Sequence, residues 1–586
     1  MKTMKKAIIS IMVLSTLSGC YKDKGSYDYH LDQMNEIKTV SFIPATVNTI
    51  AGKTIELQQP LNEEQTTGHI EVQLEQTLAS NFDNLDFFWY ISYKKDDKQV
   101  KDTVQTKGSL DVPLAIGKET QYQVLLEIKD NSTKLSKFEK IVIQTRPIFK
   151  NSLFVLHGQP GNALLGNVET VGSETKVRTD AHAVAHPDAG NKPFKDAIGL
   201  VYAAYNNDYK TPSTRLAALY SDGSSQVYNP YGLNEVLWKN YVIPSNNKDP
   251  RPFTFKSFFT TGDSSNDTDT KCIISTDGRF YWSKHMIAFK VPGENANNPN
   301  HLTDYAVTTG TITEKYIVLW DQKNNRFICV SNQDDYFNYY EEKKAGDPGF
   351  RLFNPVLDAH VDFSTLEKQG LSPKGKEAIY AYIQYKENYE DSKACFIFKD
   401  KSNNSYYLYE LTSLGGDKDD KSLALLKDDG SEEGDNNPLF SITGKKLKDF
   451  NPNTGVYSVL YSTEFMSSYV FYAEGGNLYR YNTSNADKAL IYQAPEGWNI
   501  NILKLRSYDK SSFMGEDDDN LRQYICIGMN KGNEGAVTEI KLTTAGDIDE
   551  TFNNNVYTQD ESGAKFGNIM DLQFAHEYMY YVKDYQ

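Results

Sequence analysis

The chain has 586 residues, with 62 lysines and arginines against 78 aspartates and glutamates, and a formal net charge of −16 at pH 7. An acidic surface repels nucleic-acid phosphates and anionic lipid headgroups, so neither class of partner is expected. Because one hydrophobic core stops growing at about 250–300 residues, this length predicts two or more domains. The 40 tyrosines and 29 phenylalanines favour strands and predict an all-β protein.

The N-terminus has the features of a lipoprotein signal peptide. The first six residues include three lysines, residues 7–17 are uncharged and mostly apolar, and Leu17-Ser18-Gly19 precedes Cys20. This apolar run is shorter than the ~20 residues that span a bilayer, and an ordinary cleavage site needs no cysteine. We therefore expect residues 1–19 to be removed and Cys20 to carry acyl chains that anchor the protein to a membrane.

The residues after Cys20 indicate where the protein is anchored. Tyr21 stands where an aspartate would resemble an inner-membrane retention signal. Lys22-Asp23-Lys24 resembles the surface-export signals of Bacteroidota lipoproteins, although a solvated tether without an addressing role is the alternative. We expect residues 20–37 to be a tether and the protein to lie in the outer membrane, facing the cell exterior.

Residues 38–148 have the pattern of a small β-sandwich. Turn residues separate five predicted strands, at 40–43, 54–57, 87–91, 122–128 and 141–143. Trp89, followed by the strand that begins at Tyr122, resembles PKD and other immunoglobulin-like modules, in which a buried tryptophan packs under the sheet. The Gly-Asp-Gly turn that follows the tryptophan in that family is absent, so the resemblance concerns the fold alone.

From residue 150 to residue 586 the chain repeats an apolar strand, a tight turn and a tyrosine-rich strand. Six internal hairpins are predicted, with turns at or near Asp222, Asp277, Asn324, Asn403, Gly475 and Asn533. Two more are predicted at the ends, at 153–165 and 570–582. Such a repeat predicts a β-propeller, with seven blades if the two end hairpins share one blade and eight if they do not. A stack of unrelated β modules is the alternative.

The cysteines other than Cys20 are Cys272, Cys329, Cys395 and Cys526, and each lies in an apolar, strand-like run. Their spacings fit no CxxC metal pattern, so they are predicted to be buried small apolar residues. A disulfide between strands remains open.

His182 and His186 are weak candidates for a metal site. Side chains four residues apart lie on one face of a helix or strand, so two imidazoles could meet one zinc ion. The glutamate of a His-Glu-x-x-His motif is missing and no third ligand is near in sequence, which favours surface histidines. The pattern of a calcium loop is absent from the acidic stretches at 417–420, 428–435 and 516–519. We expect no metal and no cofactor.

The sequence names no catalytic residue. It contains no nucleophile elbow, phosphate loop or dinucleotide fingerprint. Carboxylates far apart in sequence can still meet at a propeller face, so a surface hydrolase of glycans or peptides stays open as an alternative to a non-catalytic protein.

The strongest local signal for binding is an aromatic cluster between acidic pairs, formed by Tyr336, Phe337, Tyr339 and Tyr340. Exposed aromatic side chains are typical of ligand and protein contacts. Packing on a neighbouring blade is the alternative. Trp238 and Trp498, which also lie near turn residues, are weaker candidates of the same kind.

The arrangement as a whole resembles the PKD-like family lipoproteins of Bacteroidota. The resemblance rests on the run from Cys20 to Tyr29, then the PKD-like module, then a long tyrosine-rich β region. Genes of that family lie beside a SusC-type TonB-dependent transporter and its SusD-type lid lipoprotein. The resemblance implies a non-catalytic accessory of this SusCD-type importer that helps to capture or deliver oligopeptides or glycans. A structural or adhesive surface lipoprotein is a third possibility.

Overall fold

The computed structural model describes residues 35–575 except the segments 50–51, 59–66, 79–80, 96–97, 115–120, 147, 150–151, 172–173, 188, 207–211, 222–223, 236–253, 261–269, 285–304, 314–315, 332–355, 385–391, 415–439, 456, 466–467 and 507–520. The chain divides into two compact units, residues 1–146 and 147–586. No helix in the described part is long and apolar enough to cross a bilayer.

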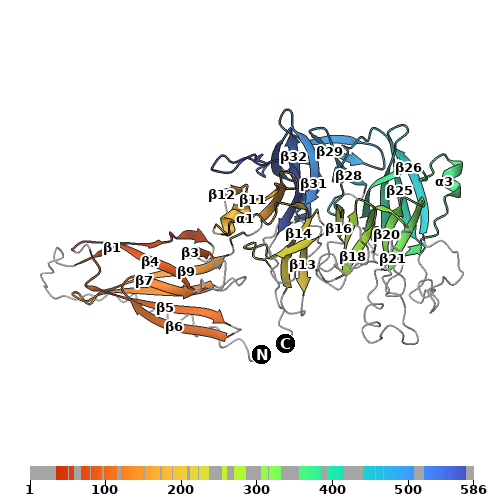
Figure 1. Cartoon of the computed structure of the whole chain (residues 1–586). Coiled ribbons are helices and arrows are strands. Elements are labelled where there is room, and N and C mark those ends of the chain that lie inside the picture. The colour runs from red at the N-terminus through yellow and green to blue at the C-terminus, as the bar shows by residue number, and fades with distance from the viewer. Residues whose placement is uncertain are drawn as a thin grey trace, which may run out of the picture. The chain divides into compact units, whose positions relative to one another are not determined.

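The first unit is built from two sheets (Figure 1). One is antiparallel, in the order β1 (Ile37–Ile43), β4 (Thr67–Gln76) and β7 (Ser109–Pro113). The other has the order β2 (Val47–Thr49), β3 (Gly52–Gln58), β9 (Ser136–Arg146), β8 (Gln121–Asp130), β5 (Leu85–Lys95) and β6 (Lys98–Thr106), and its β3–β9 pair is parallel. The five predicted strands lie within β1, β3, β5, β8 and β9.

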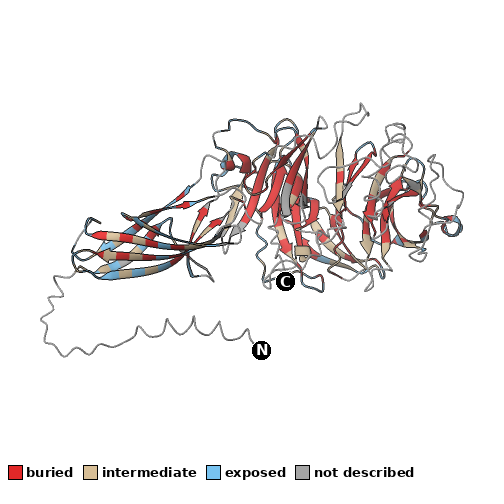
Figure 2. Cartoon of the chain, turned by 90° about the horizontal axis from the view of Figure 1, so that it is seen from below, coloured by how far each residue is buried: buried red, intermediate tan, exposed pale blue. Residues whose placement is uncertain are grey.

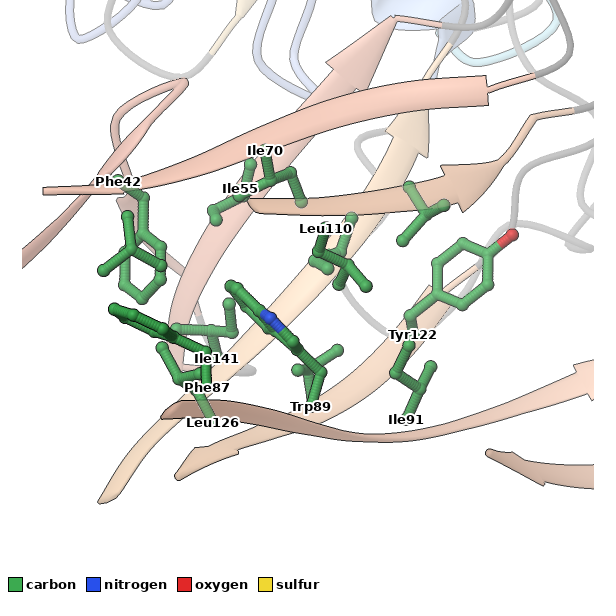
Figure 3. Close-up of a cluster of buried hydrophobic side chains, with 14 of the residues drawn as sticks. Phe42, Ile55, Ile70, Phe87, Trp89, Ile91, Leu110, Tyr122, Leu126 and Ile141 are labelled. Atoms are coloured by element: carbon green, nitrogen blue, oxygen red, sulfur yellow. The ribbon is translucent and has the colours of Figure 1, made fainter. Parts of the chain in front are cut away.

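Trp89 is central to the core of this unit. Buried and exposed residues alternate along β8, so one face of that strand contributes to the core. Trp89 is fully buried, and its Nε1 donates to Thr106 Oγ1 at 2.9 Å. Figure 3 shows Phe42 and Ile70 of the smaller sheet on the opposite side of this core from Phe87 and Trp89. The prediction that the tryptophan is buried is confirmed.

The second unit contains seven sheets in its described part. The first joins both ends of the unit, in the order β12 (Glu174–Arg178), β11 (Leu164–Val171), β10 (Ser152–His157) and β34 (Ile569–Ala575). The next two are β13 (Ala197–Asn206), β14 (Pro212–Tyr220) and β15 (Ser225–Tyr228), then β16 (Phe255–Thr260), β17 (Thr270–Ser275) and β18 (Phe280–Lys284).

The other four sheets follow in chain order. One contains β19 (Val307–Ile312), β20 (Tyr316–Asp321), β21 (Arg326–Ser331) and β22 (Leu357–Asp358), and the next contains β23 (Glu377–Gln384), β24 (Lys393–Asp400), β25 (Ser405–Ser413) and β26 (Phe440–Leu447). The third contains β27 (Val459–Leu460), β28 (Tyr469–Glu474), β29 (Asn477–Asn482) and β30 (Lys488–Gln493). The last contains β31 (Asn499–Leu505), β32 (Tyr524–Lys531) and β33 (Glu534–Lys541). Short helices lie at α1 (Ala181–Ala185) and α3 (Ser364–Lys368), and a 3₁₀ turn at Leu521–Gln523.

All six internal hairpins predicted from the sequence are present as antiparallel pairs, namely β14–β15, β17–β18, β20–β21, β24–β25, β28–β29 and β32–β33. In the β17–β18 turn Gly278 has a φ of +85°, and a Cβ there would lie 2.7 Å from Ala306 Cα. The second strand of the predicted last hairpin lies outside the described residues. Its first strand, β34, pairs with β10.

The sheets follow one another in a propeller-like order. The first strands β13, β16, β19 and β23 contact one another in succession, β27 contacts β31, and β31 and β13 both contact β34. Tyr461, directly after β27, donates its backbone N–H to Tyr380 Oη of β23 at 2.8 Å. Apolar clusters fill the spaces between successive sheets, as in Phe327 packing on Phe396. Figure 2 shows buried residues concentrated along these strands.

The four cysteines of the second unit are buried, as predicted. The disulfide that the sequence left open is absent from the described residues.

Candidate functional site: a tyrosine-rich cavity in the second unit

A cavity of about 370 Å³ lies among five of the seven sheets. Its lining comes from β16, β19, β23 and β31, from the segment between Asn453 and Thr463, and from Arg522. β16, β19, β23 and β31 each stand at one edge of a sheet and pair on one side only. Because their free edges border the cavity, consecutive residues of a strand reach it, as along the stretch from Glu377 to Ile383.

One part of the lining is cationic. Lys256 of β16 is half-buried, and its Nζ donates to the carbonyl oxygen of Thr308 at 2.9 Å. Burial lowers the pKa of Lys256, and the charge of Lys401 acts in the same direction, while Glu377 opposes both. The Glu377 carboxylate itself pairs with Lys401 at 3.1 Å. Lys399 also lines the cavity, with its Nζ 5.6 Å from the ring centroid of Tyr406.

Arg522 is the third cation of the lining, and a carboxylate neutralises it. Its Nη2 lies 2.9 Å from Glu464 Oε2, and its Nη1 donates to Thr463 Oγ1 at 2.8 Å. The guanidinium is therefore held in place by two neighbours of the segment that precedes β28.

Three tyrosine rings form a ladder along the cavity wall. The rings of Tyr382 and Tyr461 stack with centroids 4.3 Å apart and an interplanar angle of 23°, and those of Tyr380 and Tyr382 lie 6.0 Å apart at 30°. Burial raises the pKa of Tyr382, so its hydroxyl stays protonated at neutral pH. Aromatic faces stack on sugar rings and apolar side chains, and phenolic hydroxyls donate and accept hydrogen bonds. Tyr382 and Tyr461 are buried and Tyr380 is half-buried, so Tyr380 is the ring of the ladder that is most open to either kind of ligand.

The charge of the lining is opposite in sign to that of the whole chain. Its described residues include three cations, Lys256, Lys399 and Arg522, and one carboxylate, Glu377. The whole chain carries −16. A cationic cavity in an acidic protein attracts anionic groups, because a low-dielectric wall strengthens the local field.

The structure describes one of the predicted binding aromatics. Tyr336, Phe337, Tyr339, Tyr340 and Trp238 lie outside the described residues, as does Cys20. Trp498 is half-buried between β30 and β31, packs against the apolar cluster of the last two sheets, and is not among the residues that line the cavity.

His182 in α1 and His186, the residue that caps α1, lie side by side. His182 is buried, so the prediction of a surface histidine is wrong at this position. The ring centroids of His182 and His186 are 4.8 Å apart, and His186 Nε2 is 2.9 Å from the carbonyl oxygen of Gly232. Burial and the charge of His186 lower the pKa of His182, while Asp180 opposes them. Asp180 accepts from the backbone N–H of Ala183 as the helix cap. Within the described ranges no three His, Cys, Asp or Glu side chains gather as a metal site would require.

Sequence reasoning missed the cavity because its residues are spread from Lys256 to Arg522 and form no local motif. The strand that precedes each predicted hairpin could have indicated the cavity. If the repeat is propeller-like, that strand is the innermost one, and its polar and aromatic residues are candidates for an axial cavity.

Comparison with known proteins identifies the N-terminal region. Residues 20–192 match the model of the PKD-like family, and the match begins at Cys20. No curated protein matches the sequence.

The solved structures that match this chain share little sequence with it. A quinonprotein alcohol dehydrogenase-like protein from Bacteroides thetaiotaomicron is 10% identical, with 89% of this chain and 96% of that chain covered and a TM-score of 0.37. The extracellular domain of a one-component system from the same organism is also 10% identical, with 64% of this chain and 36% of that chain covered and a TM-score of 0.31. Because both TM-scores are below 0.5, these likenesses carry no inference about function.

Proposed function

From the PKD-like match at residues 20–192, we propose that this chain is a surface lipoprotein and a non-catalytic accessory of a SusCD-type TonB-dependent importer. The observation that carries the proposal is that the match starts at Cys20, the residue that the signal-peptide pattern predicts to be acylated. In this proposal the lipid holds the chain in the outer membrane, facing the exterior, and SusC-type and SusD-type proteins are its partners.

The second unit is, in this proposal, a closed seven-bladed β-propeller. The pairing of β34 with β10 supports it, because the last described strand then completes the first blade. The succession of contacts between the first strands of neighbouring sheets supports it as well. Propellers use their axial cavities and faces for binding, but the same architecture hosts many functions, so the site must carry the functional argument.

The cavity is proposed as the place where oligopeptides or glycans bind. Its volume of about 370 Å³ lies in the range of small-molecule sites. Tyr380, the most open ring of the tyrosine ladder, supplies a stacking surface and a hydroxyl group. Glycoside hydrolysis generally requires two carboxylates, and the described lining contains one, Glu377, which favours binding over the hydrolase alternative.

The test is native affinity purification of the tagged chain from outer membranes in mild detergent, followed by mass spectrometry. We expect a TonB-dependent transporter and its lid lipoprotein in near-equal amounts with the chain. A Cys20→Ser variant is the control, and it should lose both acylation and membrane recovery. Purification of the acylated chain without a transporter would contradict the proposal.

A further inference from the structure

Lys256 and Lys399 line the cavity without an ion pair to a described residue, and Lys399 lies over the ring of Tyr406. Arg522 is neutralised by Glu464, and Lys401 by Glu377. Lys256 forms no ion pair with any residue that the structure describes, and its Nζ donates to the neutral carbonyl of Thr308. An ammonium group has three donors, and a half-buried one is costly unless a partner offsets its lost hydration.

The cavity is also asymmetric along its length. Lys256 lies at the end where β19 contributes Thr308 and where β23 begins with Glu377. Tyr382 is five residues beyond Glu377 on β23, so at about 3.3 Å per residue roughly 17 Å of strand separate Tyr382 from Glu377. The cationic group is thus at one end of the cavity, and the stacked tyrosines are toward the other.

We propose that this cavity recognises short oligomers through a carboxylate, which pairs with Lys256 while the next units lie along the tyrosine ladder. The inference rests on the proposed function, whose cargo it specifies. A peptide C-terminus and a uronic acid both present such a carboxylate next to a stackable or apolar unit. An ammonium–carboxylate contact is a charge-assisted hydrogen bond and is stronger than a neutral one.

The experiment measures binding to the full mature chain by isothermal titration calorimetry. The peptide probe is a pool of tripeptides with free C-termini, and its matched probe is the same pool amidated. The glycan probe is trigalacturonate, and its matched probe is the methyl ester. We expect one free-carboxylate probe to bind, and amidation or esterification to weaken its binding about tenfold to a hundredfold. The pool that binds identifies the source of the carboxylate.

Variants test the role of Lys256. Lys256→Met should weaken binding of the free-carboxylate probe by a similar factor, and Lys256→Arg should retain most of it. Lys374 is the matched control, because it is an exposed lysine of the same unit that pairs with Glu367 at 2.9 Å outside the cavity. Lys374→Met should leave binding unchanged. If Lys256→Met fails to fold, the comparison of free and blocked probes on the unaltered chain still decides.

Two results would overturn the inference. One is equal affinity for free and blocked probes, and the other is the absence of binding by either pair. Neither result affects the recovery of the transporter by affinity purification, because that measurement needs no added ligand. Failure of this inference is therefore distinguishable from failure of the accessory proposal.

Discussion

Asp571 of β34 accepts a hydrogen bond from the ammonium of Lys504 in β31, and its Oδ2 accepts the backbone N–H of Leu200 in β13 at 2.8 Å. Both charged side chains are buried, with 6% of Lys504 and 1% of Asp571 exposed. Since β31, β34 and β13 belong to three sheets, one carboxylate links three sheets next to the β10–β34 pair. Lys504 Nζ also lies 4.3 Å from the ring centroid of Tyr457.

Removing either charge should destabilise the second unit strongly. Asp571→Asn leaves Lys504 buried without a counter-charge, and Lys504→Met leaves the carboxylate without one. We expect each to cost about 3–5 kcal/mol in the free energy of unfolding. The double variant should recover much of this loss, because asparagine still accepts from Leu200 and no charge stays buried. Urea unfolding followed by tyrosine and tryptophan fluorescence measures the effect.

An exposed ion pair in the same unit provides the control. Lys565 lies 2.6 Å from Glu534, and about half of each side chain is exposed. Glu534→Gln should change the free energy of unfolding much less than Asp571→Asn does, because water screens an exposed ion pair. If Asp571→Asn costs no more than Glu534→Gln, the buried pair does not stabilise the junction of the three sheets.

The stability of the second unit should fall as the pH drops below about 6.5, because of His157. Its Nδ1 accepts the N–H of Gly567 at 3.0 Å, which puts the proton on Nε2, and Nε2 donates to the carbonyl of Thr179 at 2.7 Å. Burial lowers the pKa of His157 below its usual 6.5. As the pH falls, the unfolded chain therefore binds a proton first, and the free energy of unfolding decreases until the folded form titrates. His157→Asn should reduce this slope.

His69 of the first unit is the control for this pH dependence. The hydrogen bond that the ring of His69 donates to the carboxylate of Asp111 raises the pKa of this exposed histidine. Any contribution to stability therefore has the opposite sign and is lost as the pH rises. His69→Gln should leave the transition of the second unit unchanged at every pH. If His157→Asn leaves the pH dependence of the free energy of unfolding unchanged, other groups cause that dependence. His182 is then the next residue to substitute.

Local patterns predicted the hairpins and missed the cavity for a physical reason. The turn at Asp277 and Gly278 and the apolar strands on either side of it are neighbours in sequence, so the signal is complete within a short window. The sequence of β19, Val-Thr-Thr-Gly-Thr-Ile, shows no regular alternation of apolar and polar residues. The free edge of this strand borders the cavity, so its sequence gives no local signal for the cavity. The β10–β34 pair joins strands more than 400 residues apart, and no local pattern specifies it. The sequence allows this pairing only as one of two alternatives, namely seven blades if the two end hairpins share a blade and eight if they do not.

Truncating Trp89 should unfold the first unit selectively. The indole is fully buried, so Trp89→Ala should cost about 3–5 kcal/mol through the cavity that it leaves. Thr106→Val keeps the volume but removes the acceptor of the indole N–H, and it should cost about 1–3 kcal/mol. Differential scanning calorimetry of the full chain should show the transition of the first unit move. A matching shift in the transition of the second unit would contradict independent stability of the two units.

Burial should protect the thiols of the second unit from alkylation. It raises the pKa of Cys272, Cys395 and Cys526, and all four cysteines expose at most 1% of their surface. Alkylation needs an accessible thiolate, so iodoacetamide should leave these residues unmodified in the native chain and modify all of them in guanidinium chloride.

A new cysteine at an exposed turn gives the reference rate for this measurement. Glu561→Cys should react at once with native protein, because Glu561 is exposed. Mass spectrometry of the digested chain follows all five sites in one sample. Cys395 in β24 pairs with Tyr382 in β23. If Cys395 is labelled as fast as the cysteine in Glu561→Cys, the sheet that contains β24 and the cavity wall that carries Tyr382 open readily. Slow labelling with the kinetics of global unfolding would instead indicate a rigid wall and favour a preformed binding site.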